Sequence, residues 1–156
     1  MAGTIDRRLK DLGIQLPRAA SPIGNYVAWV VTGNLVFISG QLPMREGVVI
    51  YQGRLGDTVS FEDGQQAAQL CGINLLAQAR AATGGDLDRI TRVIKLNGYI
   101  ASTPDFTRQP QVLNGASELM VAIFGEAGKH ARAAISCPVL PLGAAVEIDA
   151  IFEIKS

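Results

Sequence analysis

Residues 131–154, with the sequence ARAAISCPVLPLGAAVEIDAIFEI, decide the fold. The first part is mostly small or apolar and predicts a strand over Ala131–Cys137, and Pro138–Gly143 predicts a turn. From Ala145 to Ile154 every second residue is apolar, which is the period of a strand with one buried face. The predicted inward residues are Val146, Ile148, Ala150, Phe152 and Ile154, and the outward acidic ones are Glu147, Asp149 and Glu153.

Further strands are predicted upstream of this stretch. Tyr26–Thr32 and Leu35–Ser39 are rich in β-branched and aromatic residues, and Gly33-Asn34 between them is typical of a tight hairpin turn. Gln41–Thr58 is expected to be mostly loop, with one short strand over Val48–Tyr51. Another strand is predicted over Thr91–Ile100, with Ile94, Leu96 and Ile100 on one face and Lys95, Asn97 and Tyr99 on the other.

Three helices are predicted. The first covers Thr4–Leu12, with Thr4 as its N-cap and Gly13 as its stop. The second follows a capping box at Ser60–Asp63 and ends at Gly84-Gly85. Its apolar stripe consists of Ala68, Cys71, Leu75, Ala79 and Ala82, while Ile73 and Leu76 fall off that stripe. The third covers Gln111–Phe124, with Leu113, Met120, Val121 and Phe124 as its apolar residues.

This order of elements predicts an α+β fold in which two helices pack on one face of a mixed sheet, with an extra helix at the N-terminus. The whole chain, residues 1–156, is predicted to form one domain. Residues 1–21 would be an N-terminal helix and extended arm, and residues 22–156 the core.

The composition argues against several classes of protein. Fourteen Lys and Arg balance fourteen Asp and Glu, whereas binding to nucleic acid through bulk charge needs a basic excess. The longest apolar run, Tyr26–Val31, is too short to span a membrane. The start of the chain lacks an apolar signal region, and Cys71 and Cys137 form no motif, so we expect a cytoplasmic protein with reduced thiols.

Few residues suggest chemistry by themselves. The sequence has no dinucleotide-binding, phosphate-binding or metal-binding motif, and its single histidine, His130, builds neither a metal site nor a nucleophilic triad alone. Arg132 stands out because it begins a strand of small residues, where a guanidinium must be paired, reach a cleft or extend to water. In a cleft it would grip a carboxylate with two parallel hydrogen bonds.

Several segments together resemble the Rid family, the reactive-intermediate deaminases also called the YjgF or L-PSP family. They are Ile38–Pro43, Asn114, Ala131–Ala133, Leu140–Gly143 and Val146–Ala150, in the order of the family and close to its spacings. The resemblance implies a chorismate-mutase-like fold that assembles as a homotrimer, with clefts between neighbouring subunits for small carboxylates. It implies no cofactor, no metal, no nucleic acid and no membrane partner.

The resemblance also implies a reaction and a set of site residues. The reaction is hydrolysis of an enamine or imine, such as 2-aminoacrylate, to a 2-keto acid and ammonia. Arg132 would hold the carboxylate and Glu147 would hold or deprotonate the attacking water. The other binding residues that match the family are Tyr26, Ser39, Gly40 and Asn114.

The sequence departs from the family at the site. Deaminases of the family often carry a cysteine two residues after the arginine, where this chain has Ala134. The segment after Asn114 lacks the usual aromatic residue, and one extra residue separates Asn114 from Arg132. A hydrolase is therefore the leading hypothesis, the alternative is a non-catalytic trimer that binds small carboxylates, and ribonuclease action is the least favoured.

Overall fold

A computed structural model describes residues 3–156, so residues 1 and 2 of the predicted N-terminal arm lie outside the described part. The main sheet has five strands in the order β1-β2-β7-β5-β6. Their bounds are β1 Trp29–Thr32, β2 Leu35–Gln41, β5 Ile90–Ala101, β6 Ala131–Cys137 and β7 Val146–Ile154. Only β5 and β6 are parallel, which makes the sheet mixed, as predicted.

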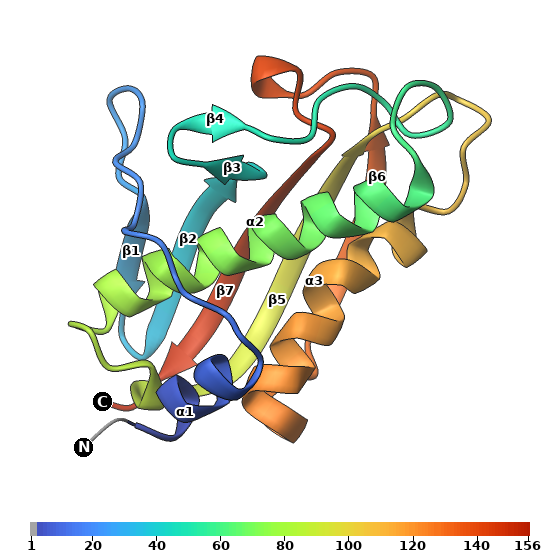
Figure 1. Cartoon of the computed structure of the whole chain (residues 1–156). Helices are drawn as coiled ribbons and strands as arrows, with labels where there is room; N and C mark the ends of the chain where they lie inside the picture. The colour runs from blue at the N-terminus through green and yellow to red at the C-terminus, as the bar shows by residue number, and fades with distance from the viewer. Residues whose placement is uncertain (1–2) are drawn as a thin grey trace.

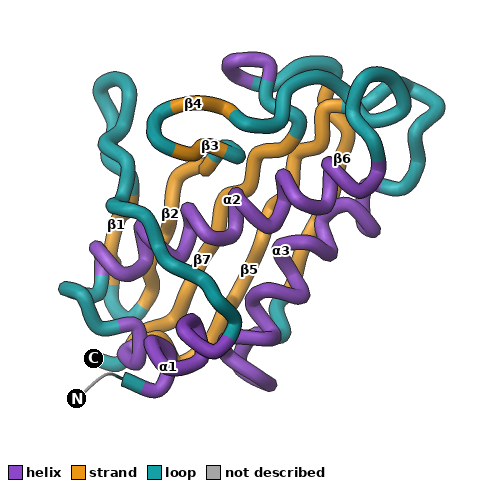
Figure 2. Tube along the Cα trace, viewed as in Figure 1, coloured by secondary structure: helices purple, strands orange, loops and turns teal. Residues whose placement is uncertain are grey.

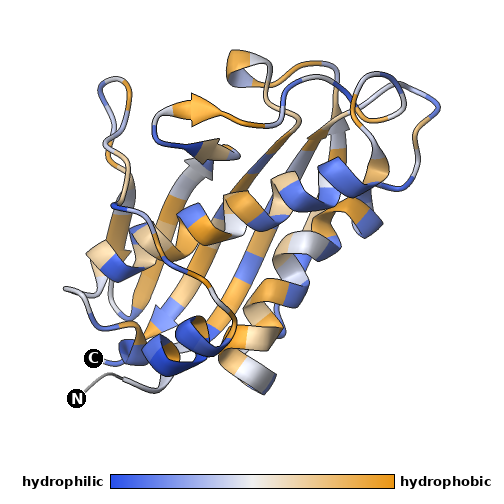
Figure 3. Ribbon diagram, viewed as in Figure 1, coloured by the Kyte–Doolittle hydropathy of each residue, from blue (hydrophilic) through white to orange (hydrophobic). Residues whose placement is uncertain are grey.

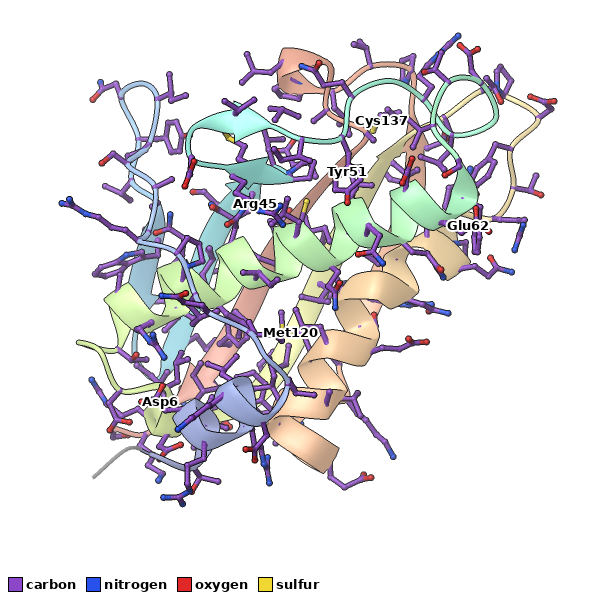
Figure 4. The ribbon with its side chains drawn as sticks, in the orientation of Figure 1. Asp6, Arg45, Tyr51, Glu62, Met120 and Cys137 are labelled. Atoms are coloured by element: carbon purple, nitrogen blue, oxygen red, sulfur yellow. The ribbon has the colours of Figure 1, made fainter. Side chains whose placement is uncertain are left out.

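Two long helices, α2 (Phe61–Ala82) and α3 (Gln109–Phe124), pack side by side on one face of this sheet (Figure 1). Ser60 caps α2 by accepting a hydrogen bond from the Asp63 N–H at 3.1 Å, as the capping box predicts. The predicted stripe of α2 lies in the core, and Met120 of α3 is fully buried between the helices and the sheet (Figure 4). Apolar residues run along the strands beneath the helices (Figure 3).

The strand β7 alternates as predicted, with its even-numbered residues buried under the helices and its odd-numbered ones half-buried on the opposite face, which we call the open face. The hairpin of β1 and β2 also forms, with Thr32 opposite Leu35. Its first strand begins at Trp29 and not at Tyr26, because Tyr26–Ala28 lie in the loop before β1. Val121 of α3, however, is 38% exposed, because it lies on the side of that helix away from the sheet.

Three register shifts in the sheet were not predicted, and the first lies at the start of β5, between Ile90 and Arg92. In β5 the register shifts between Val93 and Lys95, so Val93 rather than Ile94 enters the core. In β2 the register shifts between Ile38 and Gln41, so Ser39 and Gly40 together lie opposite one residue of β7. The short strand predicted over Val48–Tyr51 forms as β4 (Val48–Val49), two residues shorter, and it pairs with the unpredicted β3 (Met44–Arg45) in a small separate hairpin.

The N-terminal helix α1 (Thr4–Asp11) is attached to the core by a carboxylate distant in sequence. Gly3, not Thr4, is the N-cap, and Asp88 accepts hydrogen bonds from the N–H groups of Thr4 and Ile5 at 2.7 and 2.8 Å. Asp88 lies in the short 3₁₀ turn η1 (Leu87–Arg89) that precedes β5. Local sequence favoured Thr4 as the cap, but the tertiary contact supplies a charged acceptor in its place.

A long loop then runs from α1 across α2 to β1 (Figure 2). Gln78 of α2, which is 2% exposed, donates a hydrogen bond to the Ala20 carbonyl of this arm at 2.8 Å. Leu76, which falls off the predicted stripe of α2, is fully buried in the core of the single chain, so a neighbouring subunit is not needed to cover it. Among residues 3–156, none of the helices combines the length and apolar character needed to span a bilayer.

Candidate functional site

One group of predicted site residues gathers where β2 and β7 meet. The bulge in β2 brings Gly40 against the side chain of Glu147, which lies on the open face of β7. A Cβ atom on Gly40 would stand only 2.1 Å from Glu147 Oε1, so the absence of a side chain at residue 40 makes room for this carboxyl.

The carboxyl of Glu147 is half-buried and lies near a second acid. Burial raises the pKa of Glu147, and the nearby charge of Asp149 raises it further. Asp149 is itself fixed, because it accepts hydrogen bonds from Asn97 Nδ2 at 2.7 Å and from the Tyr99 hydroxyl at 3.1 Å. A carboxyl whose pKa is raised toward neutrality is suited to exchange protons with a substrate or water.

Ser39 precedes Gly40 in β2, and Tyr26 lies in the loop before β1. Ser39 Oγ donates to the Val27 carbonyl at 2.8 Å, and Ser39 N–H donates to the Ala28 carbonyl, so the loop before β1 is tied to β2. Tyr26, Ser39 and Gly40 line a small pocket of about 90 Å³. Tyr26 itself is 53% exposed.

A second group gathers around Arg132 at the edge strand β6. Arg132 Nη1 donates to Asn114 Oδ1 at 2.9 Å and to Ser117 Oγ at 3.0 Å, both on α3. Ser117 Oγ also lies 2.9 Å from His130 Nε2, and His130 Nδ1 lies 2.6 Å from the Gly128 carbonyl. The guanidinium is thus exposed and paired with neutral groups, rather than buried.

The hydrogen bonds of His130 assign the tautomer of its neutral ring. A carbonyl only accepts, so Nδ1 carries the hydrogen toward Gly128 and Nε2 is left to accept from the Ser117 hydroxyl. Burial lowers the pKa of His130, the hydrogen bond to Gly128 opposes that change, and the positive charge of Arg132 lowers it. The imidazole is therefore neutral at pH 7.

The two groups lie on opposite faces of the sheet. Arg132 pairs in register with Leu96, whose side chain is buried under the helices, whereas Glu147 pairs with Tyr99 on the open face. The strand β5 also separates β6 from β7. The fold therefore joins Tyr26, Ser39, Gly40 and Glu147 in one half-site and Asn114 with Arg132 in another, but one chain does not bring the halves together.

Sequence reasoning missed four residues of these half-sites: Ser117, His130, Asn97 and Tyr99. Ser117 lies three residues after Asn114, so helical spacing already places both on one face of α3. His130 is two residues before Arg132, but its contact with Ser117 depends on how α3 returns to β6. Asn97 and Tyr99 were placed on the outward face of their strand, and only the strand register puts them beside Asp149.

The cysteines and the acidic residues form no further cluster among the described residues. Within residues 3–156 no three His, Cys, Asp or Glu side chains are grouped in a way that could hold a metal ion. Cys71 and Cys137 are free thiols, and burial raises the pKa of Cys71 well above its ordinary value, so this thiol stays protonated.

Comparison with known proteins agrees with this architecture. Residues 6–153 match the family described as "YjgF/chorismate_mutase-like, putative endoribonuclease", and the chain therefore belongs to this family, which is the one its sequence motifs resemble. Its fold is the mixed α+β fold of that family.

Individual relatives cover nearly the whole chain. "Protein TCP17" of Trypanosoma cruzi is 45% identical over 99% of this chain and 97% of its own length. Protein Atu1372 of Agrobacterium tumefaciens, described as of unknown function, is 51% identical with a TM-score of 0.91, over 97% of this chain and 93% of that one. The structure of E. coli TdcF with bound serine is 25% identical with a TM-score of 0.63, over 89% of this chain and 94% of that one.

Proposed function

We propose that this protein hydrolyses small enamines or imines that carry a carboxylate, such as 2-aminoacrylate, to the 2-keto acid and ammonia. The observation that carries the proposal is that the chain presents two chemically complementary half-sites. One presents a permanently charged guanidinium, and the other presents a half-buried carboxyl with a raised pKa. The relative TdcF with bound serine supports a small amino-acid-like ligand for this family.

The two groups match the steps of this reaction. The enamine first tautomerises to the imine, whose C=N carbon is electrophilic. Arg132 holds the carboxylate and so orients that carbon. Glu147 accepts a proton from water as the water oxygen bonds to the carbon, and it returns this proton to the nitrogen. Glu147 next carries the proton of the new hydroxyl group to the same nitrogen. The C–N bond breaks as the C=O bond forms, so ammonia leaves and the former water oxygen becomes the keto oxygen.

Because the two half-sites lie on opposite faces of one sheet, the proposal requires a second subunit. The open face supports such an assembly, since it carries Val30, Phe37 and Ile135 with exposures of 51, 40 and 51%. In a cyclic trimer each cleft would take Glu147 from one subunit and Arg132 from the next. A trimer mass in solution is the first expected result.

A non-catalytic carboxylate binder is the second candidate. Ala134 favours it, because deaminases of the family often have a cysteine at this position. The ribonuclease activity in the family description has little support here, since equal numbers of acidic and basic residues provide no basic excess for a phosphate backbone.

The proposal is tested with 2-aminoacrylate generated in situ by a dehydratase, following release of the keto acid. The wild-type protein is expected to accelerate release. Arg132→Ala is expected to raise KM about 10- to 100-fold, as loss of charge-assisted hydrogen bonds implies. Glu147→Gln is expected to lower kcat about 100-fold or more. Arg54→Ala, which removes an exposed arginine paired with Asp57, is the control.

A mixture of the two inactive variants tests whether the site is shared. If subunits of Arg132→Ala and Glu147→Gln exchange freely, about one quarter of the clefts regain both native groups. Activity should therefore return on mixing. A wild-type protein that binds pyruvate without accelerating keto-acid release would instead establish the binder, and no recovery on mixing would refute a site shared between subunits.

A further inference from the structure

Arg132 is held at only one of its terminal nitrogens. Nη1 donates to both Asn114 Oδ1 and Ser117 Oγ, at 2.9 and 3.0 Å. Nothing within residues 3–156 accepts a hydrogen bond from Nε or Nη2. Two parallel N–H groups along one edge of the guanidinium thus remain for a ligand, in the arrangement that matches both oxygens of a carboxylate.

The direction of the hydrogen bonds explains how Ser117 holds this arginine. The neutral ring of His130 has one N–H group. Since Nδ1–H donates to the Gly128 carbonyl at 2.6 Å, Nε2 accepts the hydroxyl hydrogen of Ser117. The lone pairs of Ser117 Oγ are then turned toward Arg132. Without the imidazole the hydroxyl could rotate, and its hydrogen would compete with the guanidinium for the same direction.

We infer that Ser117 and His130 are positioning residues that fix the guanidinium of Arg132 with its Nε–Nη2 edge presented to the substrate carboxylate. The inference rests on the proposed function and extends it to two residues outside the predicted site. An arginine side chain loses considerable rotamer freedom when it is immobilised by a ligand. Fixing it in advance removes that cost from binding and favours a planar carboxylate over a single anionic oxygen.

The same contacts have a purely structural explanation, in which Ser117 and His130 only join α3 to the start of β6. The two explanations differ in what depends on Arg132. If Ser117 and His130 position Arg132, replacing them changes the affinity for the carboxylate, and this effect is absent when residue 132 has no planar guanidinium. A structural role lowers stability and persists whatever residue occupies position 132.

The experiment measures KM and kcat for 2-aminoacrylate, the Kd of pyruvate by calorimetry, and Tm, all on the full chain. Ser117→Ala is expected to raise KM and Kd about tenfold, with kcat and Tm nearly unchanged, because ground-state and transition-state binding are lost equally. Ser117→Thr keeps the hydroxyl and should recover most of the affinity. His130→Phe, which removes the acceptor for the hydroxyl, should produce a smaller rise in the same direction.

Two controls make the result specific. Ser136→Ala removes a hydroxyl from the same face of β6, one that lies 2.6 Å from Ser102 Oγ and not beside Arg132, and it should leave KM and Kd unchanged. In an Arg132→Lys background, Ser117→Ala should have no further effect on Kd, because the lysine ammonium has no planar edge to orient.

The possible outcomes separate the inference from the proposed function. An active wild type whose KM and Kd are unaffected by Ser117→Ala overturns the inference alone. A fall in kcat at constant KM also overturns it, since Ser117 would then act on the reacting atoms. A wild type that neither binds pyruvate nor accelerates hydrolysis overturns the proposed function, and the inference with it.

Discussion

The space beside Gly40 allows the position of the Glu147 carboxyl to be changed without altering the carboxyl itself. In Gly40→Ala the new Cβ would lie 2.1 Å from Glu147 Oε1, whereas ordinary contact begins at 3.4 Å. The difference between 3.4 and 2.1 Å means that this oxygen must move by 1.3 Å. The atom in the way is the end of a flexible side chain, so the side chain of Glu147 rather than the backbone is expected to yield.

Stability should change little in this variant. The φ angle of Gly40 is outside the left-handed region, so alanine fits the backbone. Replacing glycine also lowers the conformational entropy of the unfolded chain, which stabilises the folded state by about 0.4–1 kcal/mol. This gain offsets the cost of moving the carboxyl. We therefore expect the free energy of unfolding to change by less than about 1 kcal/mol, which corresponds to a Tm shift within roughly 4 °C.

Activity should fall far more than stability. Misplacing a catalytic group by about 1 Å costs roughly 100-fold in rate, so kcat/KM for 2-aminoacrylate should drop about 100-fold. In a Glu147→Gln background the same substitution should cause no further loss, because its effect passes through the carboxyl. A Gly40→Ala protein with normal Tm and with kcat/KM within threefold of wild type would refute the placement of Glu147 as the base.

Three other substitutions test the electrostatics of the fold. Glu147→Gln should raise Tm more at pH 7 than at pH 4. Burial raises the pKa of Glu147, so ionising it above its ordinary pKa of 4.5 destabilises the folded state, and glutamine removes that cost. Scanning calorimetry at both pH values checks this, and a larger gain at pH 4 would contradict it. Asp88→Ala should cost about 1 kcal/mol and speed amide hydrogen exchange in α1, because Asp88 caps Thr4 and Ile5. Since the hydrogen bond from Ile5 lowers the pKa of Asp88, that contribution is present above pH 3.8 and should disappear as pH falls through the lower folded-state pKa; exchange rates in α1 that do not respond to the substitution would show that the cap is unimportant. Burial lowers the pKa of His130, so protonating it below pH 6.5 destabilises the folded state and Tm should decrease as the pH falls. His130→Gln should make this decrease in Tm smaller. An unchanged dependence of Tm on pH would show that His130 does not cause it.

The sequence by itself determined most of the local structure. The alternation over Ala145–Ile154, the tight turn at Gly33-Asn34 and the capping box at Ser60 each depend on residues a few positions apart, and each is confirmed. The family motifs likewise indicated the fold, and the match of residues 6–153 to the family confirms it.

What depended on contacts between distant residues was decided only by the tertiary structure. Asp88 replaces Thr4 as the source of the cap for α1, although 84 residues separate them, and the bulge in β5 puts Val93 rather than Ile94 in the core. Neither follows from a local pattern, because a cap can come from any nearby acceptor and a bulge shifts every residue after it to the other face.

The same limit applies to the candidate site. The sequence identified Arg132 and Glu147 but had no means to place them on opposite faces of the sheet, since that depends on how β6 and β7 each pair with β5. It also gave His130 no role beside Arg132, because the contact with Ser117 arises only when α3 returns beside β6. Side-chain alternation is a property of one strand, whereas the face on which two distant residues meet is set by register and helix packing, and these are determined by the folded chain as a whole.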